Sequence, residues 1–257
     1  MLDFNHRTTI ADKINQFIDA GIVSERVKQE KRNYLGASRL GVACDRALQY
    51  EYVDAAKDEE KDFNGRILRI FAIGHVLEDL AAAWLRAGGF DLFTTRRNDP
   101  QGGQFGFSVA RGRLQGHVDG IINAAPAELN LRFPMLWECK SLKASSWKDT
   151  VKRGVAASKP IYAAQIATYQ AYMESQIPGL SANAALFTAI NKDTAELHHE
   201  LVPFDSALAQ RMSDRAVKVI TVSEAGELLP RITNDPEHFE CNFCAWRERC
   251  WSANHAA

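Results

Sequence analysis

The chain has 257 residues, of which 46% are hydrophobic and 25% are charged, and its formal net charge is −1. This composition is typical of a globular protein with a substantial core, and it excludes a chain whose overall basic charge would attract nucleic acid. No apolar run approaches the roughly 20 residues of a membrane span, and the N-terminus carries Asp3, His6 and Arg7 where a secretory signal is apolar. We therefore expect a cytoplasmic protein without a membrane partner.

Two helices are predicted in the N-terminal part of the chain. Residues 8–20 place apolar side chains on one face, and a threonine at either of the first two positions can cap the helix. Farther along, Ser38 can cap a helix that contains Cys44. A lone cysteine there is typical of a small buried side chain. The charged residues 54–62 are typical of a solvated segment.

Residues 64–87 give the longest helical pattern, with apolar residues three and four apart. Gly74, His75 and Glu78 interrupt the apolar face, and His75 and Glu78 share one side of the helix because they are three residues apart. Gly74 allows a second backbone or a substrate to come close. A partly buried histidine beside a surface acid is the simplest interpretation of this pair, and a functional site is the alternative.

From residue 90 onward the pattern changes to short strands separated by glycine-rich turns. Asp119 falls in the third of the first three predicted strands, and His117 shares a face with it. These three strands are predicted at residues 90–95, 104–110 and 114–122.

The next predicted strand runs from Met135 to Ser141. Because side chains alternate between the faces of a strand, Glu138 and Lys140 project together while Cys139 points the other way. If this strand pairs with the preceding one, Asp119 can reach Glu138. Two carboxylates beside a lysine suit Mg²⁺, which prefers oxygen ligands. An ion pair on a solvated sheet face is the simpler alternative.

A basic cluster follows this strand directly. Residues 145–155 are predicted to form a helix, and such a cluster is usually a solvated face. Next to a cation site it can instead bind the phosphate backbone of DNA. The members of the cluster are Lys143, Lys148, Lys152 and Arg153.

Residues 160–175 are predicted to form an amphipathic helix. Gln165 and Tyr169 lie four residues apart on one of its faces. They belong either to a hydrogen-bond network in the core or to a polar pair that faces the site. The remaining predicted elements are a hairpin and a helix, at residues 184–191, 196–202 and 206–222.

The C-terminal tail carries the motif C-x₂-C-x₅-C, formed by Cys241, Cys244 and Cys250. In a reducing compartment, three crowded cysteines favour metal ligation over disulfides. A fourth ligand must come from Cys44 or Cys139, and Cys44 is the better candidate because Cys139 lies on the face of its strand opposite the proposed cation site. Four cysteines suit either a [4Fe–4S] cluster or tetrahedral Zn²⁺.

The order of these motifs resembles the RecB-like branch of the PD-(D/E)XK nucleases that carries an iron–sulfur cluster, including the CRISPR-associated adaptation exonucleases and their phage-encoded relatives. The resemblance spans residues 38–251. In chain order, the motifs are a cysteine at Cys44, G-H-x-x-E at Gly74, G-x-x-D at Gly116, E-x-K at Glu138, Q-x-x-x-Y at Gln165 and C-x₂-C-x₅-C at Cys241.

The resemblance implies a restriction-endonuclease-like α/β fold, in which helices flank a mixed β-sheet. It also implies that Lys140 positions or activates a water, and that Gln165 and Tyr169 lie near it and near DNA. Glu78 would bind metal or orient a neighbour, and His117 is a second candidate for the histidine ligand. The implied ligands of Mg²⁺ or Mn²⁺ are His75, Asp119, Glu138 and the backbone carbonyl of Cys139. The implied cluster ligands are Cys44, Cys241, Cys244 and Cys250.

The function expected from the sequence is metal-dependent hydrolysis of DNA phosphodiester bonds by an exonuclease with a structural [4Fe–4S] cluster. The alternatives are a non-catalytic DNA-end-binding subunit and an iron–sulfur redox sensor. Homo-oligomers, or partner proteins from recombination or CRISPR adaptation, would fit these roles, in a bacterial cell or in the host of a phage. We expect one nuclease domain over residues 1–257, made of a helical part (1–63), a core (64–222) and a cluster-binding tail (223–257).

Overall fold

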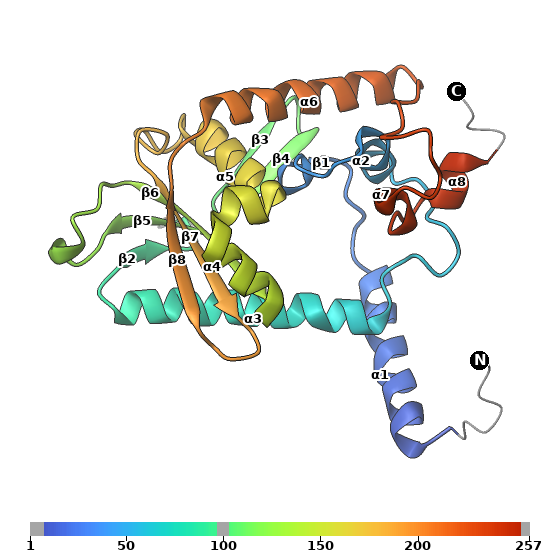
Figure 1. Ribbon diagram of the computed structural model, residues 1–257, viewed down its shortest axis with the longest axis horizontal. Coiled ribbons are helices and arrows are strands. Elements are labelled where there is room, and N and C mark those ends of the chain that lie inside the picture. Colours follow the sequence, from blue (N-terminus) through green and yellow to red (C-terminus); the bar gives the residue numbers. More distant parts are fainter. Residues whose placement is uncertain (1–7, 97–102, 253–257) are drawn as a thin grey trace.

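The structure is a computed structural model, which describes residues 8–96 and 103–252. It is a mixed α/β arrangement in which helices flank two β-sheets (Figure 1). The α-helices are α1 Ile10–Val27, α2 Asp45–Tyr52, α3 Gly65–Ala87, α4 Ala144–Ser158, α5 Pro160–Met173, α6 Ser206–Glu224, α7 Phe239–Asn242 and α8 Arg247–Trp251. Short 3₁₀ turns lie at η1 Ala37–Arg39 and η2 Ala127–Leu129.

A five-stranded mixed sheet forms the centre, in the order β2-β5-β6-β7-β8. Its middle strand, β6, pairs antiparallel with β5 and parallel with β7, so the second half of the predicted strand 114–122 does pair with the strand that carries Glu138. A smaller sheet has the order β1-β4-β3. The strands are β1 Leu35–Gly36, β2 Asp91–Phe93, β3 Gly106–Val109, β4 Leu114–His117, β5 Gly120–Ala124, β6 Met135–Leu142, β7 Ala185–Asn191 and β8 Leu197–Val202.

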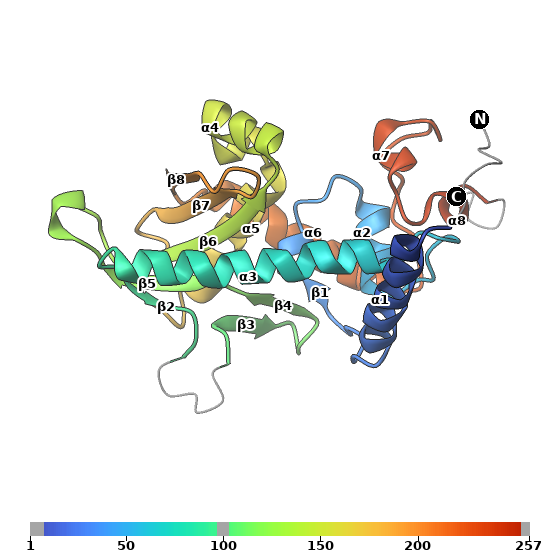
Figure 2. The same ribbon diagram turned by 90° about the horizontal axis from the view of Figure 1, so that it is seen from below.

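The two faces of the central sheet bury different sets of residues. Trp137 and Cys139 of β6 pack on the α3 side, together with Ala81 and Leu85 of that helix. Leu136 of β6 packs on the opposite side, where α5 and then α6 cover the sheet. Helix α3 accordingly runs along one side of the sheet, and α4 and α5 lie on the other (Figures 1 and 2). Successive side chains of β6 point to opposite faces of the sheet, as predicted, and they pack into two separate hydrophobic cores.

The predicted single strand at residues 114–122 is wrong. The chain leaves the small sheet after His117 and enters the central sheet at Gly120, so Asp119 lies between β4 and β5. β4 pairs with β3, whereas β5 pairs with β6. No local pattern marks this switch, because both halves have the composition of a strand.

The prediction that helix α5 is amphipathic is wrong. The helix is buried along most of its length, including Gln165, Thr168 and Gln170. It is enclosed because the sheet covers one side and α6 the other. The Gln170 Nε2 atom donates to the backbone carbonyls of Leu180 and Asn183, whereas its Oε1 atom has no hydrogen-bond partner among the described residues. Polar residues in this helix therefore serve the core and the site and do not face solvent.

Within residues 8–96 and 103–252, no helix has the length and the apolar surface that crossing a membrane requires.

Candidate active site

Asp119 joins the two acid-bearing segments. Its Oδ2 atom accepts a hydrogen bond of 2.8 Å from the Cys139 backbone N–H and lies 3.7 Å from the Lys140 Nζ atom. The paired register of β5 and β6 starts only at Gly120, so this edge of β6 is free for the Asp119 side chain. Because the N–H and C=O of one strand residue point to the same side, the Cys139 carbonyl also points toward this edge.

Glu138 is completely buried, and its two oxygens differ. The Oε1 atom accepts hydrogen bonds from Lys140 Nζ and, at 2.6 Å, from Gln165 Nε2. The Oε2 atom is also buried but has no hydrogen-bond partner in the described part of the chain. A buried carboxylate oxygen without a partner is costly, so this atom fits a bound cation next to Asp119.

The acids in the site are harder to ionise than usual. Burial and then the charge of Asp119 raise the pKa of Glu138 to about 8. The same two causes raise the pKa of Glu78, on α3, to about 7. Burial opposes the charge on Lys140, but Asp119 and Glu138 outweigh it and hold the pKa of this lysine well above its ordinary value. Lys140 is therefore an ammonium group at neutral pH, which suits it to hold a water or a phosphate oxygen and not to remove a proton.

Helix α5 supplies the predicted Gln165 and Tyr169. Burial, followed by the charge of Glu138, raises the pKa of Tyr169 and keeps it a neutral phenol. A Cβ atom at Gly116 would lie 2.8 Å from the Tyr169 ring, so the first glycine of the G-x-x-D motif lets this tyrosine pack against β4. The structure thus brings Gln165 and Tyr169 to the same site as Asp119, Glu138 and Lys140.

Tyr162 is a residue of the site that the sequence did not reveal. Its ring lies 5.6 Å from the Lys140 Nζ atom and stacks on Phe187 of β7. This contact is a cation–π arrangement, which holds the ammonium group. The available signal was its position three residues before Gln165, which places both side chains on one face of α5.

The two candidate histidines lie at the surface. His75 and His117 are both exposed, whereas Glu138 is buried. Gly74 does approach β6, since a Cβ atom there would lie 3.8 Å from the Ser141 Oγ atom. Of the G-H-x-x-E motif, Glu78 is therefore the residue whose charge is coupled to the buried acids.

Within the described residues, no group of three or more His, Cys, Asp or Glu side chains already has the arrangement to hold a metal ion. The four predicted cluster cysteines nevertheless lie near one another. Burial, and then the neighbouring Cys44 and Cys250, raise the pKa of both the Cys241 and the Cys244 thiols. The predicted helix that contains Cys44 and is capped by Ser38 is wrong, because Cys44 is itself the N-cap residue of α2 and Ser38 lies in the η1 turn.

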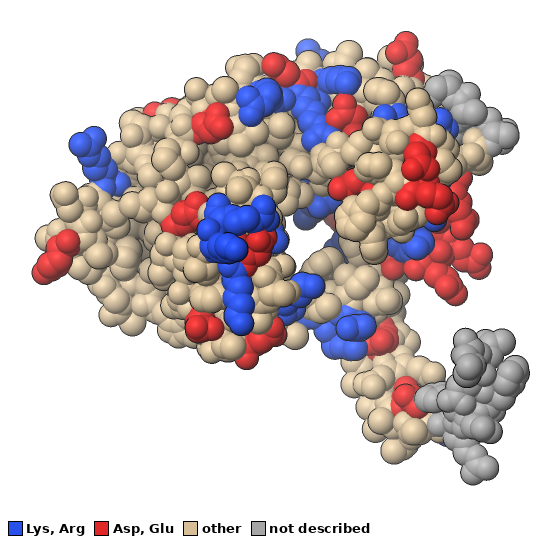
Figure 3. Space-filling model, viewed as in Figure 1, with Lys and Arg blue, Asp and Glu red and all other residues tan. Residues whose placement is uncertain are grey.

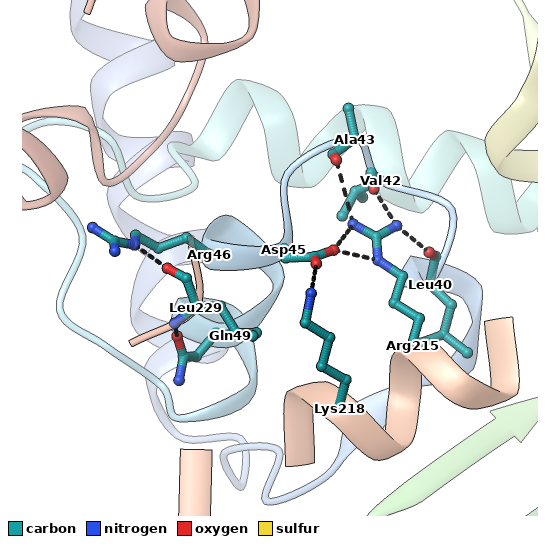
Figure 4. Close-up of polar contacts among 9 residues, drawn as sticks. All are labelled: Leu40, Val42, Ala43, Asp45, Arg46, Gln49, Arg215, Lys218 and Leu229. Atoms are coloured by element: carbon teal, nitrogen blue, oxygen red, sulfur yellow. Dashed lines mark hydrogen bonds and ion pairs between the residues drawn. The ribbon is translucent and has the colours of Figure 1, made fainter. Parts of the chain in front are cut away.

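A partly buried polar network holds the segment around Cys44 (Figure 4). The Arg215 guanidinium on α6 donates to the carbonyls of Leu40 and Val42 at 2.6 and 2.5 Å, and its Nε atom donates to Asp45 at 2.7 Å. On the other side of α2, the Gln49 side chain binds the Leu229 N–H at 2.8 Å. These contacts tie α2 both to α6 and to the segment that leads into the C-terminal tail.

The tail is also docked without a metal. Asp58 accepts hydrogen bonds from the Glu248 and Arg249 backbone N–H groups, and Trp246 donates to the Ala55 carbonyl. Arg231 donates to the Cys250 carbonyl at 2.6 Å. Hydrogen bonds therefore hold the segment that carries Cys250 against the segment that follows α2.

The predicted basic cluster lies on α4 and just before it. Lys143, Lys148 and Lys152 are exposed. Arg153 is exposed as well, but it forms two hydrogen bonds with Asp149, of 2.7 and 2.6 Å. In the space-filling view, basic side chains gather over α4 beside an opening that separates this helix from the C-terminal tail (Figure 3).

No protein-family model and no curated protein matches the chain. Among solved structures, it is similar to the crystal structure of SSO0001, with a TM-score of 0.46 and 15% identity over 91% of this chain and 94% of that one. It is also similar to an alkaline exonuclease, LHK-Exo, from Laribacter hongkongensis, with a TM-score of 0.48 and 16% identity over 80% of this chain and 93% of that one. The complex of LHK-Exo with dAMP has the same TM-score and identity over 82% and 93%. Similarities this low assign no family to the chain.

Metal-free protein should lose stability as pH rises. A carboxyl group whose pKa is raised on folding favours the folded state while it is protonated, and this contribution is lost as pH rises from its unfolded pKa through its folded pKa. For Glu138, with a folded pKa of about 8, we expect a loss of a few kcal/mol between about pH 5 and pH 8. Urea unfolding in the presence of a chelator measures it.

The matched variant is Glu138→Gln, which keeps an acceptor for Lys140 and cannot ionise. Its free energy of unfolding should vary much less over the same pH range. Glu78→Gln is the control, since it removes only the smaller shift to about 7. Equal pH dependence of the wild type and Glu138→Gln would contradict this account of the buried acid.

Proposed function

We propose that the protein is a metal-dependent DNA nuclease that hydrolyses phosphodiester bonds as an exonuclease. The observation that supports this most strongly is the buried Glu138 Oε2 atom without a partner, in a site that also holds Asp119 and the Lys140 ammonium group. Binding DNA alone requires no such set of two acids and a lysine, whereas a cation that acts on a phosphate is served by all three groups.

The residues present fit Mg²⁺ or Mn²⁺. Asp119 and Glu138 would hold the ion with the Cys139 carbonyl, and Glu78 or His75 would complete the set. When bound, such an ion polarises a phosphate oxygen and acidifies water. Lys140, held by Glu138 and the Tyr162 ring, directs its ammonium group at the attacking water or at a phosphate oxygen. Gln165 fixes the Glu138 carboxylate through its 2.6 Å hydrogen bond.

The cysteine region would carry a [4Fe–4S] cluster with a structural role, with Zn²⁺ as the alternative. Its four thiols come from the two ends of the chain, so a bound centre would close a loop around the nuclease core and couple its own binding to folding. Protein purified without air should be brown if the cluster is present. A colourless, zinc-containing protein that is fully folded would favour the zinc alternative.

One assay tests the proposed activity. End-labelled single-stranded and double-stranded DNA are incubated with the protein, with Mn²⁺ or with a chelator. Cleavage should occur with Mn²⁺ and not with the chelator, and it should proceed from the ends of the DNA. Binding without cleavage under any divalent cation would favour the DNA-end-binding alternative, and binding that changes with redox state but never leads to cleavage would favour the sensor.

The α4 lysines should supply affinity for phosphate. For Lys148→Ala or Lys152→Ala we expect weaker DNA binding, and a slope of log affinity against log salt that is smaller in magnitude by about one. Arg153→Ala is the matched control, and its effect should be smaller because Asp149 already binds this arginine. Fluorescence anisotropy across a salt series measures both quantities. Unchanged slopes for both lysine variants would exclude α4 from the DNA path.

A further inference from the structure

The C-terminal tail presents two aromatic rings to solvent. Phe239 opens α7 and Phe243 is its C-cap residue, and they are 70% and 77% exposed. Their ring centroids lie 5.0 Å apart, so the two side chains form one apolar surface. Since burying a phenylalanine stabilises a protein by roughly 1.5–3 kcal/mol, two neighbouring rings left in water favour a ligand that covers them.

The backbone below the rings is well held. The His238 carbonyl accepts from the Cys241 N–H at 2.9 Å, and its imidazole Nδ1 accepts from the Glu240 N–H. The Asn242 side chain donates to the Glu237 carbonyl at 3.0 Å. The rings are thus presented on a hydrogen-bonded turn, and little conformational freedom is lost when a ligand binds to them.

Helices α7 and α4 face each other across the opening (Figures 1 and 3). Seen from below, both project on the same side of the molecule (Figure 2). The α4 side carries the exposed Lys148 and Lys152. On the tail side, Glu237 forms an ion pair with Arg247, whereas Glu240, next to Phe239, is exposed. A chain that lies between the two helices therefore has the helix that carries the lysines on one side and the helix that carries the two exposed rings on the other.

Single-stranded DNA matches this combination. Its phosphates bind lysines, and its bases stack on aromatic rings because every base has a flat π-face. Duplex DNA does not match, since its bases are already stacked on one another and only their edges are accessible. A neutral or basic peptide would have no use for the lysines on the facing helix.

We propose that Phe239 and Phe243 form a stacking platform for unpaired bases of a DNA strand whose phosphates lie along α4. The proposal rests on the proposed nuclease function and gives its substrate a single-stranded character at this point. It also gives the tail a role in recognising DNA, apart from any role of the cysteines in binding a metal centre.

The test compares the wild type with the double variant Phe239→Ala, Phe243→Ala in a chelator, which prevents cleavage. Binding of a single-stranded oligonucleotide that contains 2-aminopurine is followed by anisotropy and by fluorescence quenching. We expect the variant to bind at least about fivefold more weakly and to lose the quenching, because stacking on one aromatic ring contributes at least this factor. Binding of a duplex of the same sequence should be unchanged.

Two further variants complete the test. Phe17→Ala removes a phenylalanine of similar exposure, 80%, from α1, and it should leave DNA binding as in the wild type. The double variant Phe239→Tyr, Phe243→Tyr keeps both rings and should bind single-stranded DNA like the wild type. The proposal is overturned if the double alanine variant quenches and binds like the wild type, or if its only change is the loss of a dimer. Failure of the wild type to bind any DNA would instead reject the nuclease function.

Discussion

Lys140→Ala is expected to lower Mn²⁺-dependent DNA cleavage by at least about a hundredfold while DNA affinity stays near the wild-type value. The lysine contacts Glu138, and its Nζ atom lies 3.7 Å from Asp119 and 5.6 Å from the Tyr162 ring, so its charge acts inside the acid cluster and not at the protein surface. A partly buried ammonium group stabilises developing negative charge far more than an exposed one. Single-turnover cleavage and anisotropy measure the two quantities separately.

The control for this variant is Lys148→Ala on α4. It should have the opposite profile, with weaker binding and normal cleavage of DNA that is already bound. Lys140→Met is a second variant, since it keeps most of the side-chain volume against Tyr162 and leaves out the charge. If both Lys140 variants cleave DNA as fast as the wild type, Lys140 has no part in catalysis.

The sequence predicted the acid cluster because its signals are local. Alternation along residues 135–141 placed Glu138 and Lys140 on one face, and β6 indeed spans Met135–Leu142 with Cys139 on the other side. The long helix was predicted just as well. Its apolar pattern spans residues 64–87, and α3 spans Gly65–Ala87 in the structure. In both cases the period of the apolar residues depends only on the element itself.

The features that the sequence missed depend on contacts between distant segments. The break between β4 and β5 arises because the two strands join different sheets, and the burial of α5 arises because α6 covers it. Arg215 lies within a helix that looks ordinary, yet it binds three carbonyls and a carboxylate around the Cys44 segment, more than 170 residues away in sequence. Nothing in the residues near Arg215 indicates these partners.

The basic cluster shows a third limit. Charge counting gave Arg153 the same role as the three lysines, but in the structure Asp149 binds it one helical turn away. The i, i+4 spacing of this pair was visible in the sequence and is a recognised source of helix ion pairs. Basic residues that already form ion pairs within a helix should therefore be left out when the positive charge available for DNA is counted.

Asp119→Asn is expected to abolish tight Mn²⁺ binding and to lower cleavage by at least about a hundredfold, with the fold kept. The asparagine side chain retains an oxygen that can accept the hydrogen bond from the Cys139 N–H, so only the charge is removed. Asp119→Ala is the matched variant that also removes this acceptor. Its free energy of unfolding, measured with urea, should be lower than that of the wild type by about 1–3 kcal/mol. Calorimetric titration with Mn²⁺ and urea unfolding separate the two effects.

A second readout follows from the charge that Asp119 places beside the other acids. Burial is the largest cause of the raised pKa of Glu138 and of Glu78, and the charge of Asp119 is the second, so Asp119→Asn lowers both pKa values in part. Metal-free Asp119→Asn should then lose less stability than the wild type as pH rises toward about 8, since its acids ionise at a smaller cost. If the variant keeps both the pH dependence and the Mn²⁺ affinity of the wild type, Asp119 is neither a ligand nor the source of the field that holds its neighbours protonated.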